Sequence, residues 1–394
     1  MKVLILSFHF QPDLSAGSFR NTALVEAIQK KLPRGSEITV MTTLPNRYSS
    51  FSVDAPKQET SSGLTIHRVA LPSHKSGMLD QSKAFVIYAR QVHKLVKGND
   101  YDLVYASSSR LMTAALGAWV SQCKQVPLYL DIRDIFVDTI KDVLSRKLAW
   151  IIKPIFAFIE RWTVKKASKV NLVSGGFLPY FQDRYPHQAF SLFTNGIDKA
   201  FIEASPLVEQ SSARTIPEVI YAGNMGEGQG LHHIIPNLAK HFEGKLQFKL
   251  IGDGGRYKHL VEALQNAGCT NVELVDPVSR EELIGFYQSA DVLFLHLNDY
   301  DAFKKVLPSK VFEYAALGKP IWAGVGGFAA KFIQENIDNA AIFSPCNDKD
   351  AVDAFANLQL VTQPRTDFTA SFARTEIMKG LADDILLVAD PDLR

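Results

Sequence analysis

The chain has 394 residues, of which 46% are hydrophobic and 21% are charged, close to the average of a soluble globular protein. This composition excludes a disordered, collagen-like or coiled-coil chain, and the length corresponds to about two domains. The 43 basic and 41 acidic residues leave a net charge of +2, so the overall charge does not require a nucleic-acid partner.

Short apolar segments typical of buried strands alternate with helical segments along the first half of the chain. At the N-terminus, Lys2–Ser7 shares a lysine and an apolar stretch with signal peptides. The stretch is short and no small-residue cleavage site follows, so we expect a buried strand. Further expected strands are Glu37–Thr42, Leu64–Arg68, Leu103–Ala106, Leu128–Ile132 and Lys169–Val173. The helical patterns between them are Asn21–Lys31, Lys83–Val96 and Leu111–Gln122.

Residues 146–169 combine an apolar helical stripe with many basic residues. The stripe consists of Leu148, Ile151, Ile152, Ile155, Phe156, Ile159 and Trp162. The basic residues are Arg146, Lys147, Lys153, Arg161, Lys165, Lys166 and Lys169, and Pro154 is expected to bend the helix. Two interpretations stay open: a helix packed on the sheet with solvated charges, or an interfacial helix that docks on anionic lipid. We find no run of about 18 apolar residues, so no membrane-spanning helix is expected.

The alternation restarts near residue 217, after the polar segment SPLVEQSSARTIP. The expected strands are Glu218–Ala222, Gln247–Ile251, Val272–Leu274, Val292–Leu295, Ile321–Gly324 and Ala341–Phe343, with helices at Leu231–His241, Tyr257–Asn266 and Arg280–Gln288. Nearly uniform apolar strands between helices are typical of parallel sheets covered on both faces. We therefore predict an α/β chain with two doubly wound, Rossmann-like domains, residues 1–198 and 217–366, joined by a linker over 199–216. They are expected to face a cleft, with ligands at the carboxyl ends of the strands.

Three turns at expected strand ends contain glycines that would let a ligand approach the backbone closely. The first holds Gly17 and leads into a helix, and its His9 and Arg20 are residues that often have structural roles. The second turn contains Gly223, Gly226, Gly228 and Gly230. This spacing suits a backbone nest for phosphate, although a tight loop without a ligand would give the same pattern. The third turn contains Gly252 and Gly254.

The segment LPSKVFEY places several polar groups at the start of a helix. Pro308 and Ser309 begin the helix, and Lys310 and Glu313 lie three residues apart on one face. A helix N-terminus with a lysine attracts a diphosphate, and a carboxylate one turn later can accept hydrogen bonds from two vicinal hydroxyls. These are the groups that a nucleotide-sugar site needs.

The ordered set GNMGEGQG, LIGDGG, SADVLFLHL and LPSKVFEYAALGKPI resembles the carboxyl-terminal half of glycosyltransferase family 4. Its subgroup with the Pro-Ser-Lys variant includes bacterial transferases for O-antigen, capsule and other surface polysaccharides. The first half is similar to the family in the Gly17 turn, in Asp131-Ile-Arg133-Asp134 and in Thr194–Asp198. The resemblance covers nearly the whole chain.

The resemblance implies a GT-B fold and a retaining, metal-independent transfer of a hexose or N-acetylhexosamine from a nucleoside diphosphate sugar. Family frequency favours UDP, with GDP open. The donor-binding residues that it implies are Gly17, Gly223, Asn224, Gln229, Gly252, Gly254, Lys305, Ser309, Lys310 and Glu313. Glu313 matches the family's ribose-binding glutamate, and the acceptor is expected near Asp131–Asp134. The tail, 367–394, would form a helix that crosses back to the first domain and braces it.

Two departures from the family concern the charges around the donor. Lys305 stands where the family has a glutamate that touches the donor sugar, and Asn224 and Gln229 replace the usual arginine and lysine of the glycine loop. The charge of the leaving diphosphate must then be neutralised elsewhere, with Lys310 as the first candidate and Lys305 or Lys304 as the second. As a hypothesis, Lys305 meets a carboxylate of an acidic donor sugar.

The expected acceptor is a lipid-linked saccharide, and the expected site residues that act in catalysis are Lys310, His9 and Asp134. We predict no cofactor and no metal: the triplets Asp100-Tyr-Asp102, Asp299-Tyr-Asp301 and Asp390-Pro-Asp392 are interpreted as solvated loop charges. The three separate cysteines indicate a reducing compartment, so we expect a cytoplasmic protein at the inner face of the membrane, held through residues 146–169. Two alternatives stay open, a nucleotide-sugar 2-epimerase of the same fold and a non-catalytic nucleotide-sugar-binding protein.

Overall fold

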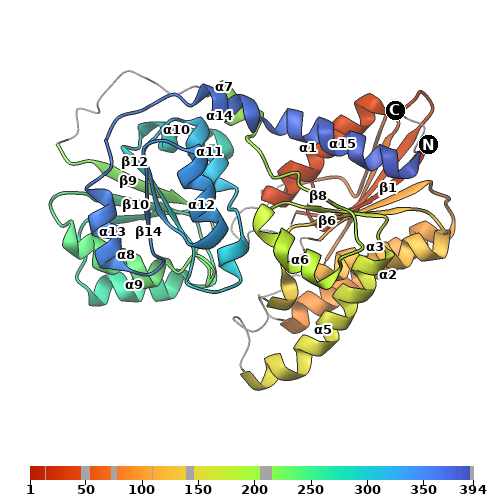
Figure 1. The fold of residues 1–394 in the computed structure, drawn as a ribbon, viewed down its shortest axis with the longest axis horizontal. Coiled ribbons are helices and arrows are strands. Elements are labelled where there is room, and N and C mark those ends of the chain that lie inside the picture. The colour runs from red at the N-terminus through yellow and green to blue at the C-terminus, as the bar shows by residue number, and fades with distance from the viewer. Residues whose placement is uncertain are drawn as a thin grey trace. The chain divides into compact units, whose positions relative to one another are not determined.

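A computed structural model describes residues 1–13, 15–45, 54–71, 78–108, 110–138, 146–204 and 215–390. They form two compact units (Figure 1). Unit 1 comprises Met1–Asn195 and Arg374–Arg394, and unit 2 comprises Gly196–Ala373. Each unit is built on its own largely parallel sheet, as the alternation of strands and helices predicted.

The sheet of unit 1 has the strand order β3-β4-β2-β1-β5-β6-β7-β8 in the described residues. Its strands are β1 (Lys2–Leu6), β2 (Glu37–Thr43), β3 (Gln58–Ser61), β4 (Leu64–Val69), β5 (Leu103–Ser107), β6 (Leu128–Ile132), β7 (Lys169–Leu172) and β8 (Phe190–Ser191). All neighbours are parallel except β3 and β4. Every residue of β5 and β6 is buried, which explains why these strands are apolar except at Ser107 and Asp131.

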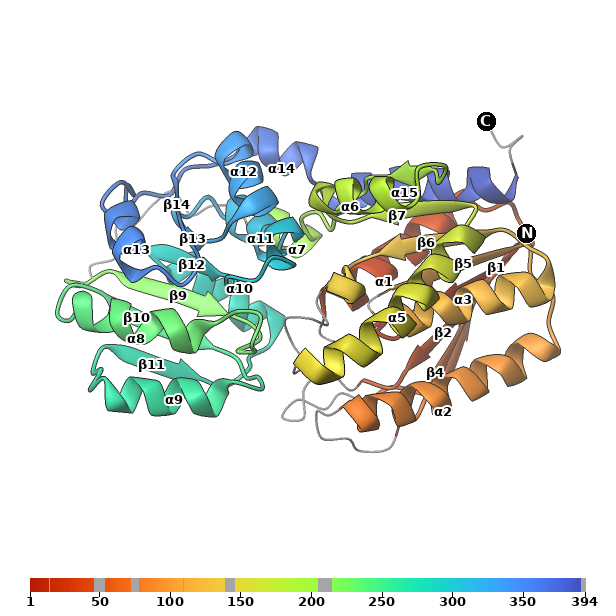
Figure 2. The same ribbon diagram turned by 60° about the horizontal axis from the view of Figure 1, so that its bottom comes forward.

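Helices cover both faces of this sheet (Figure 2). The helical elements of unit 1 are α1 (Ala16–Lys31), α2 (Met78–Lys97), α3 (Leu111–Lys124), α5 (Arg146–Lys166), η1 (Gly175–Phe177), α6 (Leu178–Arg184) and α15 (Arg374–Ala389). Helices α1 and α15 lie on one face, and α2, α3 and α5 lie on the other. Pro154 lies inside α5.

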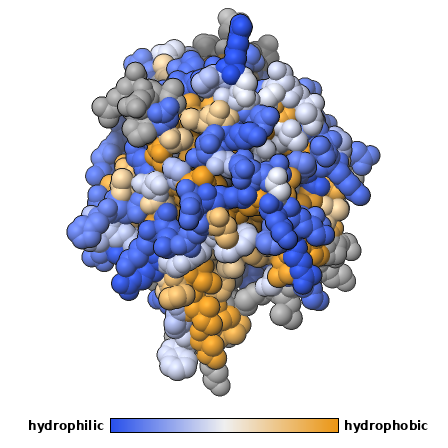
Figure 3. All heavy atoms as spheres, turned by 90° about the vertical axis from the view of Figure 1, so that its right-hand side faces the viewer, coloured by the Kyte–Doolittle hydropathy of each residue, from blue (hydrophilic) through white to orange (hydrophobic). Residues whose placement is uncertain are grey.

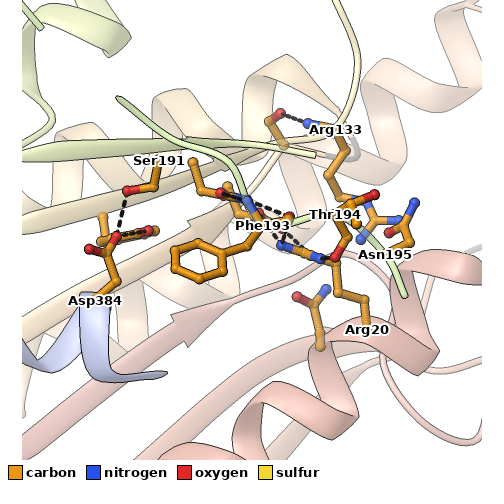
Figure 4. A network of polar contacts seen from close by, with 12 residues as sticks. Arg20, Arg133, Ser191, Phe193, Thr194, Asn195 and Asp384 are labelled. Carbon is orange, nitrogen blue, oxygen red and sulfur yellow. Dashed lines mark hydrogen bonds and ion pairs between the residues drawn. The ribbon is translucent and has the colours of Figure 1, made fainter. Parts of the chain in front are cut away.

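Helix α15 is held against the rest of unit 1 by apolar packing and by one partly buried carboxylate. Met378 and Leu381 lie in the same core as Leu24 and Ile28 of α1. Asp384 accepts hydrogen bonds from Tyr129, Ser191 and Lys169, which belong to three neighbouring strands (Figure 4). Burial alone would raise the pKa of Asp384, but these hydrogen bonds lower it overall.

Unit 2 has the strand order β11-β10-β9-β12-β13-β14, with all neighbours parallel. Its strands are β9 (Glu218–Ala222), β10 (Gln247–Ile251), β11 (Val272–Val275), β12 (Val292–His296), β13 (Ile321–Gly324) and β14 (Ala340–Phe343). Its helices are α7 (Lys199–Glu203), α8 (Leu231–His241), α9 (Tyr257–Asn266), α10 (Arg280–Ser289), η2 (Phe303–Lys305), α11 (Lys310–Ala316), α12 (Gly327–Asn336), α13 (Asp348–Phe355) and α14 (Thr366–Ser371). One core joins the sheet to α8, α9 and α13, and a second joins it to α10, α11 and α12.

The boundaries of the units differ from the expected ones. The chain leaves unit 1 after Asn195 instead of 198, and it returns at Arg374 instead of 367. Helix α7 lies inside the expected linker, where Phe201 is 1% exposed and packs into unit 2. Likewise Phe368 of α14 packs into unit 2. In the expected linker, one large aromatic side chain outweighs the polar composition from which we placed the boundary.

Candidate functional site

The glycine loop after β9 is shaped by close backbone approaches. Gly223 has a φ of 138°, and a Cβ atom there would lie 2.5 Å from Nζ of Lys310. Gly252, at the end of β10, has a φ of 134°, and its Cβ would lie 2.1 Å from the carbonyl oxygen of Gly223. A Cβ on Gly254 would lie 2.6 Å from the backbone of Met225. Only glycine therefore fits at these three positions, and the two predicted glycine turns of unit 2 form one structure.

Lys310 is the first residue of α11, and its ammonium group lies at this loop. Its Nζ is 5.2 Å from the centroid of the Tyr221 ring, within the range of a cation–π contact. The Tyr221 hydroxyl donates a hydrogen bond of 2.6 Å to the carbonyl oxygen of Asn224. The structure thus brings Lys310 together with the glycine loop, as the sequence predicted.

Asn224 and Gln229 stabilise the loop by bonding to each other. Nδ2 of Asn224 donates to Oε1 of Gln229 at 2.8 Å, and the amide of Gly226 donates to the same oxygen at 3.3 Å. The two residues that replace the family's cations therefore hold the loop in place. Their side chains carry no charge with which to neutralise a diphosphate.

The remaining candidates of unit 2 lie on η2 and α11. Ser309 is the N-cap of α11 but makes no capping hydrogen bond with its side chain. Glu313 follows Lys310 by one turn, and both are half-buried. Lys305 ends η2 and is also half-buried.

A second set of polar residues at the glycine loop was not singled out from the sequence. Glu227 accepts a hydrogen bond of 2.5 Å from the Tyr300 hydroxyl and forms an ion pair with Arg256. The hydrogen bond from Tyr300, together with Arg256, lowers the pKa of Glu227. In the sequence, the feature that could have pointed to this pair is the position of Arg256, which directly follows the LIGDGG turn. This ion pair ties the two glycine turns together.

His296, at the end of β12, is a buried support of the loop that we also did not predict. Its Nδ1 donates to the carbonyl oxygen of Gln229 at 2.6 Å, and its Nε2 accepts from the amide of Cys346 at 3.0 Å. Both contacts need the neutral ring, because a protonated Nε2 has no lone pair with which to accept. Burial lowers the pKa of His296 to about 4.

We expect His296 to make the protein less stable in mild acid. Between the ordinary pKa of 6.5 and the folded-state value of about 4, the unfolded chain binds a proton that the folded chain does not. The free energy of unfolding should therefore fall by about 3 kcal/mol as the pH is lowered through this window. Chemical unfolding at several pH values checks this. In His296→Gln this part of the pH dependence should vanish, whereas His187→Gln, at an exposed histidine, should behave like the wild type.

In unit 1 the turn after β1 is held by short polar contacts. Nδ1 of His9 lies 3.0 Å from Oδ2 of Asp13, and both residues are buried. Gly17, which we expected in a loop, lies in the first turn of α1, because Ser15 caps the helix and α1 begins at Ala16, five residues before the expected start. Asp134 lines a small cavity together with Ser108 and Glu160.

Behind this turn lies a buried pair that reaches across the sequence (Figure 4). Nε and Nη2 of Arg20 each donate a hydrogen bond of 2.9 Å to Asp131, and neither side chain is exposed to solvent. Arg20 also donates to the carbonyl oxygens of Phe193 and Thr194, the residues that lead out of unit 1. Burial would raise the pKa of Asp131, but Arg20 lowers it overall. Arg20 thus joins α1, β6 and the exit from unit 1.

In two of the three predicted loop triplets, aspartates are paired with lysines, and Asp392 of the third triplet lies outside the described residues. Lys304 lies 3.1 Å from Asp301 and 3.7 Å from Asp299, and Lys124 lies 3.3 Å from Asp100. Among the described residues, no group of three or more histidine, cysteine, aspartate or glutamate side chains could hold a metal ion. In the same part of the chain, no helix is long and apolar enough to cross a bilayer.

Comparisons with known proteins agree with this architecture. Residues 22–188 match the family described as "Glycosyl transferase 4-like domain", and residues 208–370 match the one described as "Glycosyl transferases group 1". The chain belongs to the family-4 glycosyltransferases. A curated relative of this family-4 glycosyltransferase is the putative colanic acid biosynthesis glycosyl transferase WcaI of Escherichia coli strain K12. The two are 30% identical over 100 residues, which are 25% of this chain and 24% of that protein, so the match spans about a quarter of the relative.

Solved structures show that this family-4 glycosyltransferase has the GT-B fold. It is similar to WaaG, a glycosyltransferase involved in lipopolysaccharide biosynthesis, with a TM-score of 0.65 and 14% identity over 100% of this chain and 98% of that one. It is also similar to HepE from Anabaena in complex with UDP, with a TM-score of 0.63 and 16% identity over 98% and 100% of the two chains. At these identities the likeness concerns the fold.

Proposed function

We propose that this glycosyltransferase moves a hexose or N-acetylhexosamine, with retention, from a nucleoside diphosphate sugar to a lipid-linked saccharide during synthesis of a bacterial surface glycan. The observation that carries the proposal is the ammonium group of Lys310 against the glycine loop of unit 2. The names of WcaI and WaaG support a surface glycan, and the UDP bound to HepE favours UDP over GDP.

In this proposal the protein's own groups take the charge of the leaving diphosphate. Backbone amides of the glycine loop and the ammonium group of Lys310 would contact the phosphates, and Glu313 would accept hydrogen bonds from the ribose hydroxyls. Because fixed cationic and amide groups neutralise the charge of the diphosphate, the proposed transfer needs no metal ion. His9 and Asp134 are the proposed contacts for the acceptor.

A thermal-shift screen against UDP, GDP and their sugars, with magnesium or with a chelator, tests the donor assignment. A ligand that binds only the folded state raises the Tm. We expect a shift with a uridine nucleotide that is the same with and without magnesium and is lost in Glu313→Ala. Lys331→Ala, at an exposed position on α12, is the control. No shift with any nucleotide would contradict the proposal. If the protein instead forms an epimerised nucleotide sugar without an acceptor, its function is that of an epimerase.

The same proposal places α5 on an anionic membrane. Between residues 148 and 158 it exposes Leu148, Trp150, Ile151, Ile155 and Phe158, with Trp150 81% and Phe158 71% exposed. Apolar side chains gather at the lower end of the molecule, where α5 lies (Figure 3). The exposed basic residues beside this surface are Lys153, Arg161, Lys165 and Lys166. The second half packs in the core through Thr163 and Val164, and the exposed apolar side chains of the other end support the proposed contact with the membrane.

We expect Ile155→Ser combined with Phe158→Ser to weaken binding to vesicles by about tenfold or more. The two exposed side chains lose the free energy of burial in the lipid interface. Co-sedimentation with phosphatidylglycerol-containing vesicles measures this, and added salt should weaken the wild type further through its basic residues. Val361→Ser removes a half-exposed apolar side chain of unit 2 and should leave vesicle binding unchanged. Equal binding by both variants would rule out this surface.

A further inference from the structure

A cavity of about 420 Å³ lies at one edge of the sheet of unit 2. It opens beside the carboxyl ends of β13 and β14, which are neighbouring strands with α12 and α13 next to β14 (Figure 1). Ligands of open parallel sheets bind at this end of the strands. Among the described residues that line the cavity, none is a proposed donor contact, so the cavity is distinct from the donor site.

One part of the cavity wall is apolar. It is formed by Val325, Ala330, Ile342 and Pro345. A Cβ atom on Gly326 would lie 3.9 Å from Cδ of Pro345 and from Cγ of Lys304, so the glycine leaves space where these two side chains approach each other. The volume lies within the range of small-molecule pockets, and such pockets combine an apolar wall with a few polar groups.

A carboxylate that is fixed by backbone contacts also lines the cavity. Asp350 lies in the first turn of α13, where its amide donates a hydrogen bond of 3.2 Å to Oδ1 of Asn347. Its Oδ2 accepts a hydrogen bond of 2.6 Å from the amide of Ser344, the residue that follows β14. The hydrogen bonds from Ser344 lower the pKa of Asp350, so the carboxylate stays ionised at neutral pH. Asp350 therefore presents an oriented acceptor for hydroxyl groups.

A second carboxylate of the cavity, that of Asp299, is balanced by a lysine. Nζ of Lys304 lies 3.7 Å from Asp299 and 3.1 Å from Asp301, and both Asp299 and Lys304 line the cavity. A cationic ligand at Asp299 would meet the ammonium group of Lys304, and an anionic ligand would meet Asp299 and Asp350. A neutral ligand whose hydroxyl groups both donate and accept can bond to groups of either sign. The charges therefore favour a polyhydroxyl ligand over an ion.

We propose that this cavity binds one hexopyranose ring of the glycan that the enzyme extends. The hydroxyl groups of the ring donate to Asp299 and Asp350 and accept from Lys304, and its C–H groups pack on the apolar wall. The inference rests on the proposed function only for the source of the sugar. It gives unit 2 a contact with the glycan that is separate from its contacts with the donor.

Saturation-transfer difference NMR of the full chain with methyl α-D-glucopyranoside tests this inference. We expect a Kd in the millimolar range, since a single ring offers few contacts. Ala330→Trp fills the cavity and should weaken binding at least about tenfold. Gln334→Trp adds the same side chain at an exposed position of the same helix and should bind like the wild type. Asp350→Asn, which keeps one oxygen for the amide of Ser344, should weaken binding by a factor of about three or more.

The outcomes separate the inference from the proposed function. Glycoside binding that is lost in Ala330→Trp supports the site, and if the same protein transfers no sugar, the proposed function alone is overturned. Melting curves show whether Ala330→Trp folds, and if it does not, Asp350→Asn decides. A wild type that binds no glycoside, or variants that bind it normally, overturn the inference and leave the donor assignment standing. Butylamine that binds more tightly than the glycoside and is lost in Asp350→Asn also overturns it, because the cavity is then a cation site.

Discussion

Replacement of Lys310 by alanine should lower kcat for sugar transfer by about 10²–10³-fold. A Cβ atom on Gly223 would lie 2.5 Å from Nζ of Lys310, so a diphosphate held by the loop amides would meet this ammonium group directly. Negative charge on the leaving diphosphate is largest in the transition state. The loss should therefore appear in kcat more than in KM, and steady-state kinetics with a matched donor and acceptor measure the two separately.

Two further variants separate the charge of Lys310 from its packing. Gly223→Ala leaves Lys310 in the chain but introduces a methyl group at its Nζ, so it should lower kcat as well. Lys331→Ala removes an exposed cation from the same unit and should leave kcat unchanged. A Lys310→Ala enzyme within a factor of about two of the wild type would contradict this assignment. Another cationic group would then have to neutralise the leaving diphosphate, and Lys305 and Lys304 would be the next residues to replace.

The sequence predicted the central strands well and the edges poorly. The expected limits of β6 and β9 coincide with the observed ones, because strands buried on both faces consist mainly of apolar residues, here with Asp131 and Glu218 as the exceptions. Strand β3 is exposed at every residue, so it carries no such pattern. Helix α7 was hidden in a polar segment for the same reason, since Phe201 is the single residue of this helix that is buried.

In the candidate site, too, some features could be predicted from the sequence and others depend on contacts between distant residues. Glycine turns are visible in a sequence because a close backbone approach permits one residue type, and the structure shows that Gly223 and Gly252 meet. The pairing of Arg20 with Asp131 spans 111 residues of sequence, and neither residue shows which partner it has. The neutral state of His296 follows from its burial and its two backbone partners, which only the folded chain brings together.

The second large effect concerns that buried pair. Arg20→Met should lower the free energy of unfolding of unit 1 by about 3–5 kcal/mol, because it leaves the Asp131 carboxylate buried without its main partner. Chemical unfolding followed by tryptophan fluorescence measures the change, since Trp119, Trp150 and Trp162 lie in unit 1. Lys124→Met breaks a pair with an almost fully exposed Asp100 and should cost less than about 1 kcal/mol.

A double variant shows whether the cost comes from the isolated charge or from lost packing. In Arg20→Met with Asp131→Leu no carboxylate remains, so the double variant should recover much of the stability that Arg20→Met alone loses. Acid should reduce the difference between Arg20→Met and the wild type, because the variant can protonate Asp131. The wild-type pair persists below the ordinary pKa of 3.8, and its contribution is lost only as the pH falls through the lowered value. If the double variant is no more stable than the single one, Arg20 acts mainly through its bonds to the carbonyl oxygens of Phe193 and Thr194.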